Sequence, residues 1–266
     1  MSRMSKSFVV GGVCLAVVVS VISAVVLITH ASSNSSSQPS PVGAARRNNK
    51  GARNLSLQPE ASRVARQLGK RFGPTSRAAS TFSGQLNTSD GQQSITLTRR
   101  QTENGETAEL NFSNRALTWN AEEGAKANAN APNGPEQLLL ERLILDSPDN
   151  FVLAQLRGAS YFTVARNVRP TDATDGYSGP LWNLVRVDEP QVDENRRALS
   201  TWRIYYINVL TGLPDRVEYQ FNGKEIRAEF LEWTEQHGEK TASHIRWSSD
   251  GQTIMEYRAT SVSINQ

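Results

Sequence analysis

The chain has 266 residues, of which 38% are hydrophobic and 21% are charged, and its formal net charge at pH 7 is +3. Residues 32–77 carry nine cations against one carboxylate, a sum of +8, whereas residues 78–266 carry 18 cations against 25 carboxylates, a sum of −7. The length suffices for one domain of about 200 residues with a substantial core, or for two small domains. Because residues 78–266 are acidic, the positive total does not indicate a nucleic-acid-binding protein.

The N-terminal segment predicts a membrane helix. Residues 8–29 contain no charged side chain, and at about 1.5 Å per residue a helix of this length crosses a hydrocarbon core of about 30 Å. The apolar run is longer than the roughly 7–15 residues typical of a signal peptide, which favours a signal anchor over residues 1–31. A cleaved signal peptide, with Thr29 and Ala31 as the small residues at the cut, is the alternative.

The body of the protein is expected in a bacterial periplasm. Cys14, inside the apolar run, is the only cysteine, so the exported part has no disulfide, which is common in the periplasm and unusual for a secreted eukaryotic domain. Long domains that follow an anchor are translocated largely regardless of their charge. We expect a single-pass protein of the bacterial inner membrane with its C-terminal domain in the periplasm, or a periplasmic or secreted protein if the signal is cleaved.

A linker and a basic helix follow. Residues 32–56 are rich in Ser, Asn, Pro and Gly and predict a flexible basic linker, so that a domain occupies residues 57–266. Pro59 opens a predicted helix that has one apolar and one basic face. The basic stalk, residues 32–77, predicts contact with an anionic membrane surface. For the helix, a basic face that is merely exposed to solvent is the alternative. The apolar residues of the helix recur at helical spacing: Ala61, Val64, Ala65, Leu68 and Phe72.

From Ser80 onward the pattern alternates with period two, which predicts strands. The loop 121–134, made of small residues, is expected to be unordered, and two helices are expected at 135–146 and 148–157, broken at Pro148. Asn-Gly at 222–223 and Ser-Asp-Gly at 249–251 predict tight hairpins. About eleven strands in total indicate an α+β fold built on an antiparallel meander. They are expected at 81–87, 93–101, 107–113, 116–120, 160–168, 181–188, 201–209, 215–222, 224–233, 241–248 and 252–264.

The strands within 201–233 predict a sheet with one apolar and one wet face. Arg203 is placed on the wet face, where Tyr205 and Ile207 interrupt the polar pattern and are expected to meet another element. The apolar face must be covered, and the helices are the available cover. Its expected members are Ile204, Tyr206, Val217, Tyr219, Phe221, Ile226, Ala228 and Phe230.

The helix at 135–146 is apolar on two sides. A row of Leu138 and Leu145 lies nearly opposite a broader stripe, although a helix that only covers a sheet needs one stripe. The second row either packs on the helix at 148–157 or contacts a ligand or partner. The broader stripe consists of Leu139, Leu140, Leu143 and Ile144.

Two segments, SNRALTWN (113–120) and YINVLTGLPDRVEYQFNG (206–223), resemble the periplasmic lipoprotein carrier LolA and its relatives, the outer-membrane lipoprotein-sorting proteins. The resemblance spans roughly 57–264. It implies a curved antiparallel half-barrel whose concave face is covered by helices and holds acyl chains or other hydrophobic ligands. The expected ligand-binding residues are Trp119, Leu139, Leu140, Leu143, Ile144, Tyr206, Tyr219 and Phe221.

The sequence offers little for catalysis. The body has two histidines, His237 and His244, and no thiol, so we expect no metal site and no cofactor. It has no nucleophile elbow and no phosphate-binding glycine loop. We therefore expect a noncatalytic, membrane-anchored domain that binds a hydrophobic ligand such as lipid or a lipoprotein acyl chain. The alternative is a protein-interaction or scaffold module of a cell-envelope assembly, with an envelope protein as its partner.

Overall fold

The computed structural model describes residues 59–69, 79–102, 105–113, 115–121, 124–127, 135–170, 177–192 and 198–265. These residues belong to one compact unit. The predicted anchor at 8–29 and the predicted linker at 32–56 lie outside the described residues. None of the described helices is long and apolar enough to cross a membrane.

Helix α2 (Pro59–Leu68) begins at the predicted proline and buries one face, as its spacing indicates. It ends at Gly69, whose φ of +70° is the left-handed conformation common after a helix. Phe72, predicted to continue the apolar stripe, lies outside the described residues. The later helical region comprises α3 (Pro135–Leu145), α4 (Asn150–Leu153) and a 3-10 turn, η1 (Ala154–Arg157).

The described strands number twelve and form a single sheet, one more than the number expected. The additional strand, β5, occupies 124–127, within the segment expected to be an unordered loop. This segment is a strand because it pairs with β4. The strands are β1 (Ala79–Thr88), β2 (Gly91–Thr102), β3 (Gly105–Asn111), β4 (Ala116–Asn120), β5 (Gly124–Ala127), β6 (Ser160–Val168), β7 (Trp182–Val192), β8 (Ala198–Asn208), β9 (Pro214–Phe221), β10 (Lys224–Gln236), β11 (Glu239–Ser249) and β12 (Gln252–Asn265).

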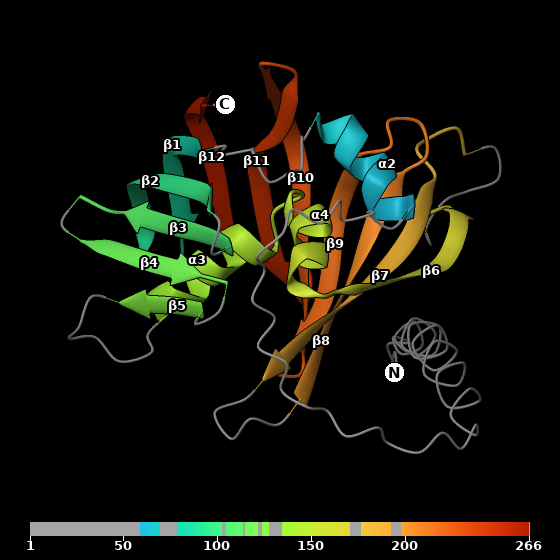
Figure 1. The fold of residues 1–266 in the computed structure, drawn as a ribbon, viewed down its shortest axis with the longest axis horizontal. Helices are drawn as coiled ribbons and strands as arrows, with labels where there is room; N and C mark the ends of the chain where they lie inside the picture. Colours follow the sequence, from blue (N-terminus) through green and yellow to red (C-terminus); the bar gives the residue numbers. More distant parts are fainter. Residues whose placement is uncertain are drawn as a thin grey trace, which may run out of the picture. The chain divides into compact units, whose positions relative to one another are not determined.

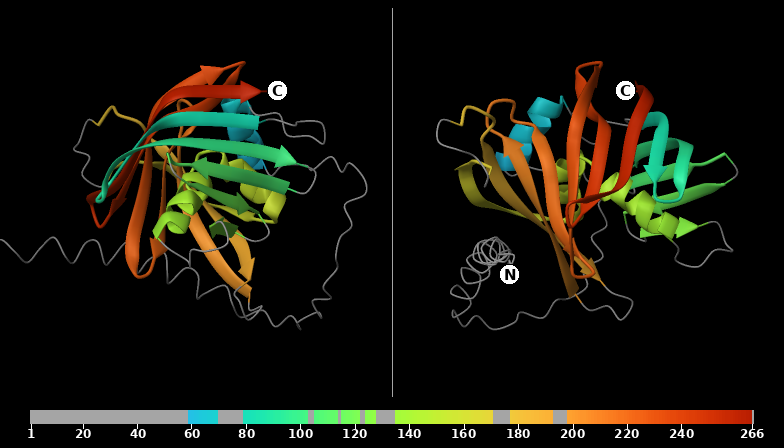
Figure 2. Two further views of the ribbon diagram at one scale, coloured as in Figure 1. Left: turned by 90° about the vertical axis from the view of Figure 1, so that its left-hand side faces the viewer. Right: turned by 180° about the vertical axis from the view of Figure 1, so that it is seen from behind.

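The sheet is one antiparallel series with two free edges. Its order runs β5-β4-β3-β2-β1-β12-β11-β10-β9-β8-β7-β6, so the first strand pairs with the last. The helices come between β5 and β6 in the chain, at the point where the path crosses from one sheet edge to the other. Figures 1 and 2 show the sheet curving around these helices and around α2, which lies on the same face. The architecture is therefore an open half-barrel with helices on its concave face.

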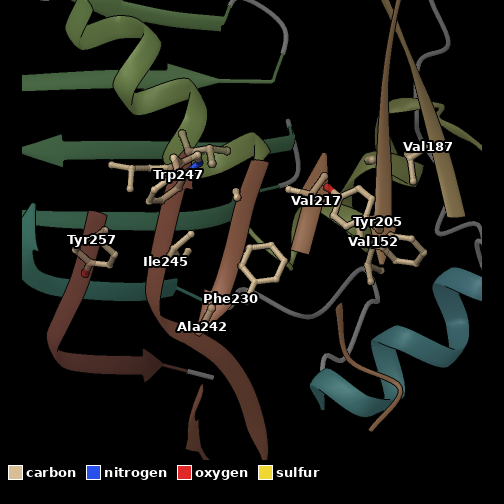
Figure 3. Packing of buried hydrophobic residues seen from close by; sticks show 14 of the residues in the cluster. Val152, Val187, Tyr205, Val217, Phe230, Ala242, Ile245, Trp247 and Tyr257 are labelled. Atoms are coloured by element: carbon tan, nitrogen blue, oxygen red, sulfur yellow. The ribbon is translucent and has the colours of Figure 1, made fainter. Parts of the chain in front are cut away.

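The core lies between the concave face and the helices (Figure 3). Trp247, Tyr205 and Phe151 are its largest fully buried side chains, and the Phe151 ring packs edge-to-face on Tyr205 with centroids 4.9 Å apart. Val217 of β9 joins them and is also fully buried. The interior of the half-barrel is thus filled by side chains from strands and helices.

The face assignment of β8 was wrong by one residue. Tyr205 pairs with Val217, and both are fully buried, whereas Ile204 and Tyr206 pair with the outward-facing Glu218 and Arg216. The positions expected to interrupt the polar face are therefore the core positions. Since side chains alternate with period two, a shift by one residue exchanges the whole strand between faces.

Candidate functional site

A cleft of about 210 Å³ lies between α3 and the strands β8 and β9. From the helix, Leu138 and Leu145 line it, which are the two residues of the second apolar row. The sequence left open whether this row packs on a helix or meets a ligand, and the structure places it against a space beside the sheet. The lining residues are Leu138, Glu141, Arg142, Leu145, Asp146, Thr201, Trp202, Arg203, Tyr219, Gln220 and Phe221.

The cleft contains two buried polar atoms that form no hydrogen bond with the described residues. The guanidinium of Arg142 lies over the Phe221 ring, 5.7 Å from its centroid, and has no ion-pair partner among the described residues. Its Nε is buried and forms no hydrogen bond, and the same holds for Oγ1 of Thr201. Because unpaired buried polar atoms cost free energy, a ligand that satisfies them would be favoured. The cleft can thus offer an apolar wall, a cation and a hydroxyl to one ligand.

Asp146 forms the floor of the cleft and is fully buried. Its carboxylate accepts hydrogen bonds from the Tyr219 hydroxyl at 2.7 Å and from Trp247 Nε1 at 3.1 Å, and Arg203 Nε lies 3.2 Å away. Burial raises the pKa of Asp146, while Arg203 and the bond from Tyr219 act in the opposite direction. The C-terminal end of α3 is therefore fastened to three strands of the sheet.

The pKa values of the two cleft residues that hold Asp146 are also raised. For Tyr219, burial raises the pKa and the charge of Asp146 adds to the effect, so the hydroxyl stays protonated and donates. For Arg203, burial acts to lower the pKa, but the attraction of Asp146 and Glu189 outweighs it. Arg203 thus stays charged, and the Asp146–Arg203 pair is a buried ion pair.

A second group of buried charges ties the α3–α4 turn to both halves of the sheet. Arg99 of β2 pairs with Glu106 of β3 and donates from Nη1 to Ser147 Oγ at 2.8 Å. Arg157 of η1 lies 3.4 Å from Glu106 and 3.1 Å from Glu189 of β7. The helical segment therefore connects β2 and β3, on one arm of the half-barrel, to β7 on the other arm.

The buried charges of this ionic network were missed by the sequence analysis. Arg203 was placed on the wet face, and no role was predicted for Asp146. For Arg203 a signal was present: Tyr205 and Ile207 follow it at alternate positions, which places the arginine on the buried face of β8. The members of the ionic network are Arg99, Glu106, Asp146, Asp149, Arg157, Glu189 and Arg203.

The predicted ligand-binding residues do not all lie together. Tyr219 and Phe221 line the cleft. Six other members are placed elsewhere: Trp119, Leu140, Leu143 and Ile144 are buried in the core, Leu139 packs against the core, and Tyr206 faces outward. The cleft therefore uses the second row of α3, not its broader stripe.

Tyr206 belongs to the convex face of the sheet, which corrects its expected position. Its hydroxyl donates to Glu218 Oε2 at 2.6 Å, and the guanidinium of Arg216 lies 3.9 Å from its ring centroid. Burial against these neighbours, together with the charge of Glu218, raises the pKa of Tyr206 to about 12. A ligand in the cleft cannot reach it through the sheet.

His237 and His244 lie in different parts of the β10–β11 hairpin. His237 is exposed in the β10–β11 turn, with φ of +52°, and His244 lies 3.3 Å from Glu232. Within the described ranges, no group of three or more His, Cys, Asp or Glu residues is placed to hold a metal ion.

Comparison with known proteins finds no matching family model and no match among curated proteins. Solved structures do match. An outer membrane lipoprotein-sorting protein domain from Vibrio parahaemolyticus aligns with a TM-score of 0.47 at 8% identity, over 78% of this chain and 91% of that chain. A DUF1329 family protein from Desulfovibrio piger gives 0.46 at 11% identity, over 76% and 89%.

A LolA superfamily protein from Nitrosomonas europaea aligns with a TM-score of 0.49 at 8% identity, over 77% of this chain and 94% of that chain.

Proposed function

We propose that the domain is a noncatalytic binding module for a hydrophobic ligand with an anionic or polar head group, held in the periplasm by an N-terminal membrane anchor. The ligand class is an amphiphile such as a fatty acid, a lipid or the acyl chain of a lipoprotein. The anchor rests on the uncharged run at 8–29, and the periplasmic location rests on the absence of cysteine after Cys14.

The cleft between α3 and β8–β9 is the main support for ligand binding. It joins the apolar side chains of Leu138, Leu145 and Phe221 to Arg142, whose buried Nε has no hydrogen bond. An acyl chain would lie along the leucines, and its carboxylate or phosphate would pair with the guanidinium. At about 210 Å³ the cleft is smaller than the roughly 300–1,000 Å³ of drug-sized pockets, so it would hold part of a chain.

Binding can be measured with a soluble protein of residues 32–266 and dansyl-undecanoic acid, whose fluorescence rises in an apolar site. Leu138→Asn should weaken binding about tenfold, because an apolar contact is lost. Arg142→Gln should weaken binding of the acid but not of its methyl ester, since only the acid carries a charge. Leu231→Asn, at an exposed leucine of β10 outside the cleft, is the matched control.

A scaffold role is the second candidate, and the filled interior favours it. Leu140, Ile144, Phe151 and Val152 are fully buried, and the ionic network joins the helices to both arms of the sheet. A close-packed interior suits a rigid interaction module. If the acid and its ester bind equally weakly to the wild type and to all variants, and native mass spectrometry finds no co-purifying lipid, ligand binding is rejected in favour of this role.

A further inference from the structure

We propose that one end of the domain docks directly on an anionic lipid bilayer. This surface, which we call the α2 end, combines exposed cations with exposed aliphatic side chains. It is independent of the cleft, so its function does not depend on whether the cleft takes a ligand. Its residues are Arg63, Arg66, Val164, Arg166, Arg169 and Leu210.

Two contacts bring these residues to one end. Glu60 in the first turn of α2 accepts a hydrogen bond from Thr163 of β6 at 3.1 Å. Near the other end of α2, Gln67 packs against Gly212 in the β8–β9 turn, where an added Cβ would come within 2.9 Å of its side chain. Figures 1 and 2 show α2, this turn and the far end of β6 side by side in different views.

The aliphatic members of the α2 end are unusually exposed. Leu210 stands at the tip of the β8–β9 turn with 86% of its surface accessible, and Val164 of β6 is 40% accessible. A single large aliphatic side chain at a turn tip gains free energy when it enters the apolar boundary of a bilayer. A surface that combines exposed aliphatic side chains with arginines has the composition of surfaces that bind the membrane interface.

The charges of the α2 end complement an anionic surface. Its four arginines are exposed, and none is ion-paired within the part of the chain that the structure describes. Residues 78–266 sum to −7, so these cations make the domain strongly asymmetric in charge. An anionic bilayer would attract this end and repel the rest, which fixes the orientation of the domain on the membrane.

The position of α2 in the chain points to a membrane and not to a separate acidic protein. α2 is the first described element after the uncharged segment 8–29, and only residues 30–58 separate them. A tether of that length reaches at most about 100 Å and keeps the local concentration of membrane surface high. The choice of a membrane rests on the proposed anchor: the bilayer that would hold segment 8–29 is the membrane surface within reach of the α2 end.

Insertion of Leu210 can be measured in a protein of residues 32–266, which contains no cysteine. Leu210→Cys labelled with the environment-sensitive dye NBD is mixed with vesicles of phosphatidylcholine and phosphatidylglycerol. We expect a blue shift and a rise in emission, which vesicles of phosphatidylcholine alone do not produce. Leu231→Cys, at a leucine of β10 that is 41% exposed, is the control and should not respond. Vesicle binding without a response at Leu210, or with equal responses at both sites, would overturn the proposal.

A second pair of proteins separates the α2 end from the basic linker. Arg63→Gln with Arg66→Gln should lower vesicle affinity about 25-fold, since each cation at an anionic surface is worth about 1 kcal/mol. Arg100→Gln with Lys224→Gln removes the same charge from exposed sites on β2 and β10 and should have little effect. Equal losses in the two pairs would mean that the linker alone binds the membrane, and no vesicle binding at low salt would favour an acidic protein partner; either result rejects the proposal.

Discussion

Arg203 shows how a charged residue can be a core residue. It is 8% exposed, pairs with Asp146, and lies with its guanidinium over the Tyr219 ring at 4.9 Å. Taking such charges out of water is costly, and the cost is offset only when every partner is in place. We therefore expect the intact pair to add little to the free energy of unfolding and mainly to fix one position of α3 against the sheet. Removing one partner should lower the free energy of unfolding by much more than the pair adds to it.

Arg203→Met should lower the free energy of unfolding by about 3–5 kcal/mol, because it leaves the buried Asp146 without its cation. The loss of that cation also raises the pKa of Asp146 further. A carboxyl with a folded-state pKa above its unfolded value contributes stability below the unfolded pKa and loses it as pH rises through the folded pKa. Urea denaturation should therefore find the variant less destabilised near pH 5 than near pH 8.

Arg186→Met is the control for this change. Its pair with Asp188 lies on a partly exposed surface, with side-chain exposures of 27% and 23%, so the loss should stay near 1 kcal/mol or below and vary little with pH. Equal losses for the two variants would show that Asp146 and Arg203 do not act as a buried pair.

At the scale of elements, α3 has two different apolar rows. Leu140 and Ile144 are fully buried under the sheet, whereas Leu138 and Leu145 line the cleft on the other side of the helix. Residue type cannot distinguish these rows, because both consist of large aliphatic side chains. Packing distinguishes them, since one row has neighbours on all sides and the other borders an open space.

Leu140→Ala should destabilise the domain by about 2–5 kcal/mol, the usual cost of truncating a leucine in a packed core. Leu138→Ala should lower the free energy of unfolding by less, because the space left by the truncated side chain opens into the cleft. Urea denaturation of the two variants gives the comparison. A full core cost at Leu138 would mean that the cleft is closed in solution.

Helix α2 depends on a close approach of two glycines. Gly69 has φ of +70°, and a Cβ built on it would lie 1.8 Å from the carbonyl oxygen of Gly238 in the β10–β11 turn. Only glycine permits this contact, since both the backbone conformation and the space exclude a side chain. The end of α2 is therefore docked through main-chain contact to the strand pair β10–β11.

Gly69→Ala should destabilise the domain by clearly more than the control Gly251→Ala. Gly251 has a similar φ of +81°, but nothing lies within 4 Å of its Cβ position, so its replacement should cost only the strain of the left-handed conformation, about 1–2 kcal/mol. Hydrogen exchange should show faster exchange in α2 for Gly69→Ala alone. If the two variants are equally stable, the contact with Gly238 contributes nothing.

In the molecule as a whole, two long-range connections form the half-barrel. The first strand pairs with the last, and the helical segment links the two free edges β5 and β6. Arg99, Glu106, Arg157 and Glu189 then connect strands of both arms through η1 and the α3–α4 turn. The open sheet is held in its curved form by side chains inside it.

The proposed anchor gives a prediction for the intact protein. N-terminal sequencing of the mature chain from membranes should return the original N-terminus, because the apolar run at 8–29 is longer than a signal peptide requires. The protein should then resist extraction by high salt and require detergent. A mature chain that begins at Ser32 would show instead that the segment is a cleaved signal.

Local sequence signals predict most of the helices and strands of the folded domain, β5 excepted. Hairpins occur where turn residues predict them: Asn222 and Gly223 have φ of +50° and +76°, and Asp250 and Gly251 have φ of +48° and +81°. The start of α2 at Pro59 and the break at Pro148 also follow from single residues whose backbone restrictions are local. Local chemistry sufficed there because no distant contact competes with it.

The face of β8, the pairing of β5, the ionic network and the cleft depend on contacts between residues that are distant in the sequence. In β8 the run from Trp202 to Ile207 is aromatic, aliphatic or Arg at every position, so period-two alternation cannot choose a face. Pairing of Tyr205 with Val217 and burial of Arg203 against Asp146 make the choice. The partners of those residues lie up to 57 positions away along the chain, and a pattern read over a few neighbours does not contain them.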